Sequence, residues 1–253
     1  MDAEKVKEAV RDKYGKIAAT ATSCCGPNCG CGDGAGPEYT VLMNDEYQGI
    51  DKTILESADL GLGCGTPAAF ADLAEGMTVL DLGSGAGIDV FIAAKAVGPA
   101  GEVIGVDMTD EMLVKANANR QKLGIAHAEF RKGEIEDLPV LSGSVDRVIS
   151  NCVINLVPDK RRAFAEIFRV LKPGGRFTVS DIVSVGQIPE DLRKDMLLWA
   201  GCVAGALDKE EYLSVVRDAG FTDLDIAAEK SYDLGREIAV GLRSITLTAR
   251  KPA

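Results

Sequence analysis

Cysteine is the reactive residue type that stands out in this 253-residue chain, which has seven cysteines and a single histidine. Four of them crowd into the segment "CCGPNCGCG" and are Cys24, Cys25, Cys29 and Cys31. The other three are far apart in the sequence and are Cys64, Cys152 and Cys202. A thiolate binds soft metals and metalloids, whereas a buried thiol often serves only as a small apolar core residue. The elements that carry each cysteine therefore decide between the two roles.

Short β-branched runs alternate with helical patterns from residue 77 to residue 183. The strand-like runs are "TVLDLG", "EVIGVD", "AEFRKG", "SVDRVISN" and "RFTVSDIV", and the helical patterns cover 86–97, 109–123 and 158–171. This alternation is typical of right-handed βαβ units and predicts an α/β fold with a Rossmann-like, doubly wound sheet. We expect an N-terminal helix and Cys-rich segment (1–65), a ligand-binding core (66–185) and a small C-terminal α+β lid region (186–253).

Charge and composition narrow the class of ligand. The net charge is −11 and the pI is about 4.7, which disfavours nucleic acid and anionic membranes as partners. No apolar run approaches the roughly 18–20 residues of a membrane span, and the charged amino terminus lacks the apolar core of a secretion signal. The sequence predicts a cytoplasmic protein that acts on a small molecule, with thiols that form no disulfide framework.

A glycine loop, "VLDLGSGAG", follows the first strand of the predicted core. Its glycines permit a ligand to approach the backbone, but position 88 is Ile, so the dinucleotide pattern G-x-G-x-x-G is absent. Asp81 would also repel a pyrophosphate, and its charge suits a cation. S-adenosylmethionine is cationic and lacks phosphate, and Asp107 could accept hydrogen bonds from its ribose hydroxyls.

With these features the sequence resembles the class I S-adenosylmethionine-dependent methyltransferases over residues 77–183. The segments "KGEIEDLP" and "VLKPGG" share in the resemblance. It implies a seven-stranded sheet with one antiparallel strand. It also implies a set of donor contacts, which map onto Asp81, Gly83, Gly85, Asp107, Met108, Glu134, Ile135 and Asn151.

The methyl acceptor has to be inferred from the remaining side chains. The histidine, His127, lies at the start of a predicted strand, away from the carboxyl ends where a site is expected, and aromatic residues make up only 5% of the chain. Cys152 ends a central strand, Cys64 precedes a short helix predicted from Thr66 to Leu73, and Cys202 lies in a glycine-flanked turn. We expect all three to converge over the donor, although three unrelated buried cysteines would also fit the sequence.

Trivalent arsenic takes three thiolate ligands and keeps a lone pair, which needs no general base. Zinc typically requires a fourth ligand. Three segments, "GLGCGTP", "SNCVINLVPDKRR" and "AGCVAGAL", are similar to segments of the arsenite methyltransferases, which the chain resembles from about residue 40 to its end. The resemblance implies arsenic-binding roles for Cys64, Cys152 and Cys202, arsenite and methylarsenite as substrates, and a thiol reductant of the thioredoxin or glutathione type.

The same resemblance implies that an additional amino-terminal cysteine partners Cys64, with Cys24 or Cys25 favoured. A Gly-rich segment with four thiols could equally bind adventitious zinc or be disordered, and its cysteine spacing matches no strong metal signature. Two other functions stay open on the sequence. A small-molecule C-, N- or O-methyltransferase would not need the three separate thiols, and a thiol-based metalloid-binding protein would not need the donor site.

Overall fold

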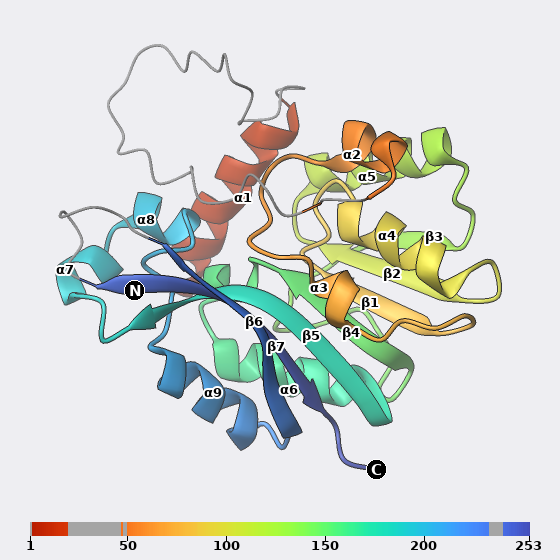
Figure 1. Cartoon of the computed structure of the whole chain (residues 1–253). Helices are drawn as coiled ribbons and strands as arrows, with labels where there is room; N and C mark the ends of the chain where they lie inside the picture. Colours follow the sequence, from red (N-terminus) through yellow and green to blue (C-terminus); the bar gives the residue numbers. More distant parts are fainter. Residues whose placement is uncertain (1, 20–46, 48–49, 233–239) are drawn as a thin grey trace.

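The computed structural model, drawn in Figure 1, describes residues 2–19, 47, 50–232 and 240–253. The clustered cysteines Cys24, Cys25, Cys29 and Cys31 lie outside these residues. The helices are α1 (Ala3–Ala19), α2 (Lys52–Ala58), α3 (Pro67–Phe70), α4 (Ile88–Val97), α5 (Asp110–Leu123), the 3-10 helix η2 (Ile154–Leu156), α6 (Lys160–Val170), α7 (Glu190–Arg193), α8 (Met196–Ala200) and α9 (Lys209–Asp218). The strands are β1 (Thr78–Leu82), β2 (Glu102–Asp107), β3 (Ala128–Lys132), β4 (Val145–Asn151), β5 (Leu171–Val185), β6 (Thr222–Tyr232) and β7 (Gly241–Arg250).

The described strands form one seven-stranded sheet in the order β3-β2-β1-β4-β5-β7-β6. β1 to β5 pair in parallel, and β7 runs antiparallel to both β5 and β6. Figure 1 shows α4 on one side of this sheet and α6 with α9 on the other. The predicted doubly wound sheet with one antiparallel strand is confirmed.

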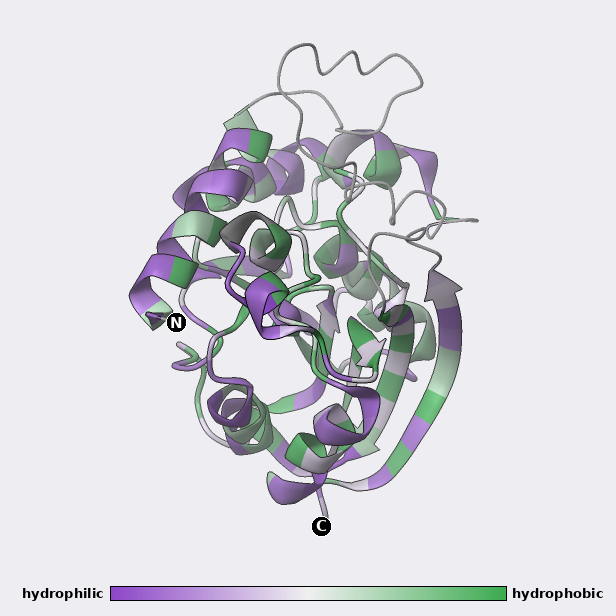
Figure 2. Cartoon of the chain, turned by 90° about the vertical axis from the view of Figure 1, so that its left-hand side faces the viewer, coloured by the Kyte–Doolittle hydropathy of each residue, from purple (hydrophilic) through white to green (hydrophobic). Residues whose placement is uncertain are grey.

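Two apolar layers hold the helices against the sheet. On one face Phe164 and Ile167 of α6 pack with Tyr212 of α9, and all three side chains are fully buried. On the other face α4 buries Val90 and Phe91. Figure 2 shows both hydrophilic and hydrophobic residues on the outer helices, as expected where only one face of a helix is buried.

Two expected helix ends differ from the structure. α6 ends at Val170, and Leu171 already belongs to β5, so the last residue of the helical pattern predicted over 158–171 is a strand residue. α3 spans only four residues and stops well before Leu73. Asp72 has a φ of 46°, a left-handed conformation that cannot continue a right-handed helix, and Thr66 makes no side-chain cap hydrogen bond.

Residues 186–253 do more than cover the sheet. They supply β6 and β7, and β7 lies between β5 and β6 in the sheet. Ten residues of β5 pair with residues of β7. They also supply α8 and the turn that carries Cys202. None of the helices in the described ranges is long and apolar enough to cross a membrane.

Candidate active site

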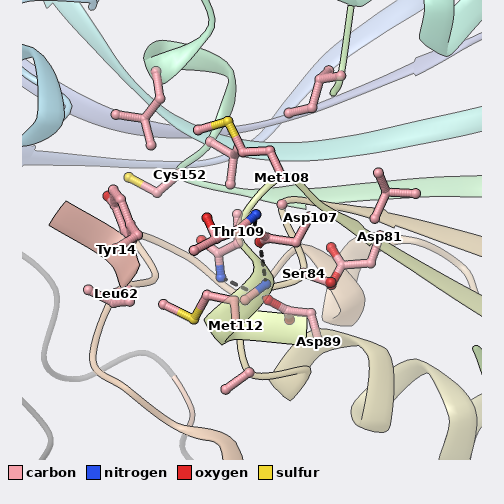
Figure 3. Close-up of a pocket in the computed structure, with 18 of the residues that line it drawn as sticks. Tyr14, Leu62, Asp81, Ser84, Asp89, Asp107, Met108, Thr109, Met112 and Cys152 are labelled. Carbon is pink, nitrogen blue, oxygen red and sulfur yellow. Dashed lines mark hydrogen bonds between the residues drawn. The ribbon is translucent and has the colours of Figure 1, made fainter. Parts of the chain in front are cut away.

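A pocket opens at the carboxyl ends of the parallel strands, where ligands bind in folds of this kind. It encloses about 1080 Å³ including its open mouth, which suits a ligand of nucleoside size. The eight donor contacts that the sequence predicts all line it: Asp81, Gly83, Gly85, Asp107, Met108, Glu134, Ile135 and Asn151. Figure 3 shows Asp81 and Asp89 across the pocket from Tyr14 and Cys152. The strand ends therefore gather the predicted residues into one cavity.

The glycine loop after β1 needs its glycines. Gly83 and Gly85 have φ values of 65° and 51°, in the left-handed region that side chains disfavour. A Cβ atom on Gly83 would also lie 2.5 Å from the side chain of Val153. The backbone N–H groups of Gly83 and Ser84 both donate to the carbonyl oxygen of Val106, at 2.8 and 3.0 Å. This holds the loop against the end of β2 and leaves its open side to the pocket.

Three aspartates with raised pKa values line the pocket. Burial raises the pKa of Asp81 well above its usual range and that of Asp89 to about 6, and neighbouring carboxylates add to the effect on Asp81. Burial also raises the pKa of Asp107, which accepts hydrogen bonds from the N–H groups of Gly85 (2.9 Å) and Thr109 (2.8 Å). One buried oxygen of Asp89 has no hydrogen-bond partner among the described residues. A cationic ligand would relieve this excess of negative charge.

The amino-terminal helix α1 closes one side of the pocket, which the sequence does not reveal. Lys7 of α1 pairs with Glu134 at 2.7 Å and with Glu136 at 3.3 Å. Val10 and Tyr14, further along the helix, also line the cavity. The spacing of Lys7, Val10 and Tyr14 is helical, but nothing in the sequence indicates which element this face covers.

The three separated cysteines meet beside the pocket, as predicted. Cys64, Cys152 and Cys202 are only 1%, 3% and 1% exposed, and they share one apolar cluster with residues of α1 and α8. None of the three forms a disulfide bond with another described cysteine. The Cys202 thiol donates a hydrogen bond to the carbonyl oxygen of Cys152 at 3.3 Å, and the neighbouring thiols of Cys202 and Cys64 raise the pKa of Cys152. Of the three cysteines, Cys152 also lines the pocket.

Two of these cysteines have strained backbones. Cys152 has a φ of 60° and Cys202 a φ of 63°, and within the described ranges only two other non-glycine residues have positive φ. The left-handed conformation costs such a residue roughly 1–2 kcal/mol. Strain of this kind persists where the surrounding structure enforces it and clusters at functional sites. The backbone therefore supports a role beyond packing for Cys152 and Cys202.

The thiols of Cys152 and Cys64 have raised pKa values. Hydrogen bonds with the other two cysteines, together with burial, raise the pKa of Cys152 well above its usual range. Burial raises the pKa of Cys64. Tyr14 packs against the same cluster, where burial and the neighbouring thiols of Cys202 and Cys152 raise the pKa of its hydroxyl group. No group of three or more His, Cys, Asp or Glu side chains in the described part of the chain is placed to hold a metal ion, so the three thiols do not form a ready-made metal site.

His127 stays outside this site. Its Nε2 atom lies 2.9 Å from the carbonyl oxygen of Ala94 in α4, at the opposite end of the sheet from the pocket. Tyr47 and Asp89, in contrast, are pocket residues that the sequence interpretation did not include. Asp89 stands in the first turn of α4, directly after the glycine loop, and this position was the available signal.

The chain is similar to a known protein family and to named proteins. A methyltransferase-domain family model matches residues 73–220. The arsenite methyltransferase of Halobacterium salinarum is 44% identical over an alignment of 266 positions. The alignment spans 100% of this chain and 68% of that protein. This chain belongs to the arsenite methyltransferases. It is accordingly an enzyme whose methyl donor is S-adenosylmethionine.

Other arsenite methyltransferases support the assignment. The mouse arsenite methyltransferase is 33% identical over 87% of this chain, and the chain spans 59% of that protein's length. The crystal structure of an arsenic(III) S-adenosylmethionine methyltransferase from Chlamydomonas reinhardtii superposes with a TM-score of 0.71 at 35% identity. This superposition covers 86% of the chain and 75% of the algal structure. The Halobacterium and mouse enzymes are thus both longer than this chain.

Proposed function

We propose that this chain methylates arsenite and methylarsenite, with arsenic bound by Cys64, Cys152 and Cys202. The observation that carries the proposal is the position of Cys152. It shares one buried cluster with Cys64 and Cys202, its carbonyl oxygen accepts from the Cys202 thiol at 3.3 Å, and the same residue lines the pocket. A substrate held by Cys152 is therefore adjacent to the cavity for the methyl donor.

The pocket residues fit S-adenosylmethionine, which supplies an electrophilic methyl group on a sulfonium centre. Asp81 and Asp89 provide buried carboxyl groups whose charged forms a cationic ligand would favour, and Asp107 provides an acceptor for hydroxyl groups. The glycine loop gives close access to the backbone at Gly83 and Gly85. Helix α1 lies along the same pocket, where Lys7 pairs with Glu134.

Protonated thiols are suited to arsenite as the substrate. Arsenite carries three hydroxyl groups, so its reaction with three thiols forms three As–S bonds and releases three water molecules with no net change in protons. The raised pKa values of Cys64 and Cys152 therefore do not oppose binding. Methylarsenite carries two exchangeable hydroxyl groups and can engage only two thiols. The strained pair Cys152 and Cys202 is our choice for that clamp.

Thiolate-bound arsenic(III) retains a lone pair, and this lone pair is the nucleophile. No general base is required, in agreement with the position of His127 outside the site. Transfer of a methyl cation formally raises arsenic from the trivalent to the pentavalent state, so a further round needs two electrons. We propose that these come from thiols, which a thioredoxin- or glutathione-type reductant regenerates, and that the enzyme acts in the reducing cytoplasm.

Methyl transfer from radiolabelled S-adenosylmethionine tests this function. The protein is incubated with a thiol reductant and with arsenite, methylarsenite or no acceptor, and the labelled products are separated. We expect labelled methylarsenicals only when an arsenical is present. Arsenite that binds without accepting label would indicate a metalloid-binding protein, and label transferred only to organic acceptors would indicate a small-molecule methyltransferase.

A further inference from the structure

Two side chains from different strands hold both polar groups of the Cys64 peptide. The backbone N–H of Cys64 donates to Oδ1 of Asn151 at 2.9 Å. The carbonyl oxygen of Cys64 accepts from Oγ of Ser244 at 2.6 Å. Asn151 ends β4, and Ser244 lies in β7. Cys64, which is part of no helix or strand, is thus tied to two strands of the sheet.

The residues beside Cys64 reinforce this attachment. The amide of Asn151 donates to the carbonyl oxygen of Gly65 at 2.7 Å. A Cβ atom on Gly63 would lie 2.7 Å from Nδ2 of Asn151, and one on Gly65 would lie 2.4 Å from Oγ of Ser180. The two glycines therefore let the loop rest directly on side chains of β4 and β5. A loop of this composition has little rigidity of its own, so these contacts set its conformation.

The amide of Asn151 is fully engaged by protein groups. Besides the carbonyl oxygen of Gly65, the hydroxyl oxygen of Tyr47 (2.9 Å) and Oδ2 of Asp89 (3.1 Å) lie within hydrogen-bond distance of its Nδ2 atom, so three acceptors share its two N–H groups. Ser244 is different, because it is buried and is not among the residues that line the donor pocket. Cys64 is thus held by Asn151, which lines the pocket, and by Ser244, which does not.

We infer that Asn151 and Ser244 are positioning residues for the third thiol and thereby favour arsenite over methylarsenite as a substrate. This inference rests on the proposed function, in which arsenite uses three thiols and methylarsenite two. If Cys64 is the thiol that only arsenite needs, loss of its tethers slows the first methylation and spares the second. A general packing defect would slow both reactions alike.

Ser244→Ala is the primary test, with Ser184→Ala as a matched control. Ser184 is also buried and lies in β5, two residues from Ile182, which pairs with Ser244 across the sheet. Its hydroxyl group has no hydrogen-bond partner among the described residues. The ratio of the arsenite rate to the methylarsenite rate is measured for each variant with the same donor and reductant. We expect the ratio to fall about tenfold in Ser244→Ala, the effect of one lost hydrogen bond, and to stay at the wild-type value in Ser184→Ala.

Two more variants keep the test decisive if Ser244→Ala does not fold. Asn151→Ala should lower the same ratio. Ser244→Thr keeps the hydroxyl group and should therefore keep the wild-type ratio. Cys64→Ser serves as the reference for complete loss of the third thiol. If Cys64→Ser loses the arsenite reaction selectively while Ser244→Ala and Asn151→Ala keep the wild-type ratio, the inference is wrong and the proposed function stands. If wild type methylates neither arsenical, the proposed function itself fails.

Discussion

The thiol of Cys202 donates a hydrogen bond to the backbone carbonyl oxygen of Cys152 at 3.3 Å. The two residues are fifty positions apart in the sequence, and both have left-handed backbones. The contact joins the end of β4 to the turn after α8. Because each backbone is held in a conformation that an L-residue disfavours, the geometry of this pair is imposed by the surrounding fold. In the proposed function this pair forms the two-thiol clamp for methylarsenite.

The two classes of cysteine variant should differ in substrate range. Cys152→Ser and Cys202→Ser should lose the methylation of both arsenite and methylarsenite, because a hard, protonated hydroxyl replaces a soft ligand. Cys64→Ser should lose the arsenite reaction and retain much of the methylarsenite reaction. Product speciation from each substrate measures this, after donor binding has been confirmed for each variant. Near wild-type methylation of methylarsenite by Cys152→Ser would reduce Cys152 to a packed core thiol.

Arsenite should change the fluorescence of Trp199, the one tryptophan of the chain. The indole N–H donates to the carbonyl oxygen of Leu156 at 3.2 Å, and the backbone N–H of Cys202 donates to the carbonyl oxygen of Trp199 at 3.0 Å. Movement of the Cys202 thiol toward arsenic should therefore alter the surroundings of the indole. The change should disappear in Cys202→Ser. A titration of the wild-type protein that leaves the emission unchanged would argue against this coupling.

The donor should bind before any arsenic is present, and Asp107→Ala should weaken that binding by about 1–3 kcal/mol, because a charged acceptor is lost. Isothermal calorimetry with S-adenosylmethionine measures the effect. Asp110→Ala is the control, since Asp110 is exposed, pairs with Lys132 and is not among the residues that line the pocket. Equal affinities of Asp107→Ala and wild type would remove Asp107 from the donor site.

The stability of the donor-free protein should carry the signature of Asp89, whose pKa is raised by burial from 3.8 to about 6. Between these values the folded state binds more protons than the unfolded state, so the contribution of this group to the free energy of unfolding falls as pH rises. Relative to Asp89→Asn, wild type should lose up to about 3 kcal/mol between pH 4 and pH 7. Denaturant unfolding of both proteins across this range measures the difference. A constant difference would show that Asp89 ionises normally.

The sequence predicts the sheet and the donor pocket well for a physical reason. Alternating strand and helix patterns leave few topologies, and the carboxyl ends of parallel strands meet at one edge, so Asp81 and Asp107 had to lie together. The position of α1 was not predictable, because an amphipathic helix reveals its buried face but not its partner. The ion pair between Lys7 and Glu134 joins residues 127 positions apart and leaves no local signal.

The positions of the thiols were predictable only in part. A cysteine at the end of β4 can be placed from the strand pattern, but Cys64 and Cys202 lie on loops whose paths depend on distant side chains. Ser244, which binds the carbonyl group of Cys64, is 180 positions away from it. The positive φ of Cys152 is also invisible in the sequence, because no turn residue such as glycine or asparagine marks it.

X-ray absorption spectroscopy at the arsenic edge tests the central claim most directly. The protein carries serine at positions 24, 25, 29 and 31, so that the clustered thiols cannot contribute, and is loaded with one equivalent of arsenite. We expect arsenic to have three sulfur neighbours and no oxygen in its first shell. After Cys64→Ser or Cys152→Ser, we expect two sulfur neighbours and one oxygen. A first shell that contains oxygen before either substitution, or that keeps three sulfurs after one, would contradict binding by Cys64, Cys152 and Cys202.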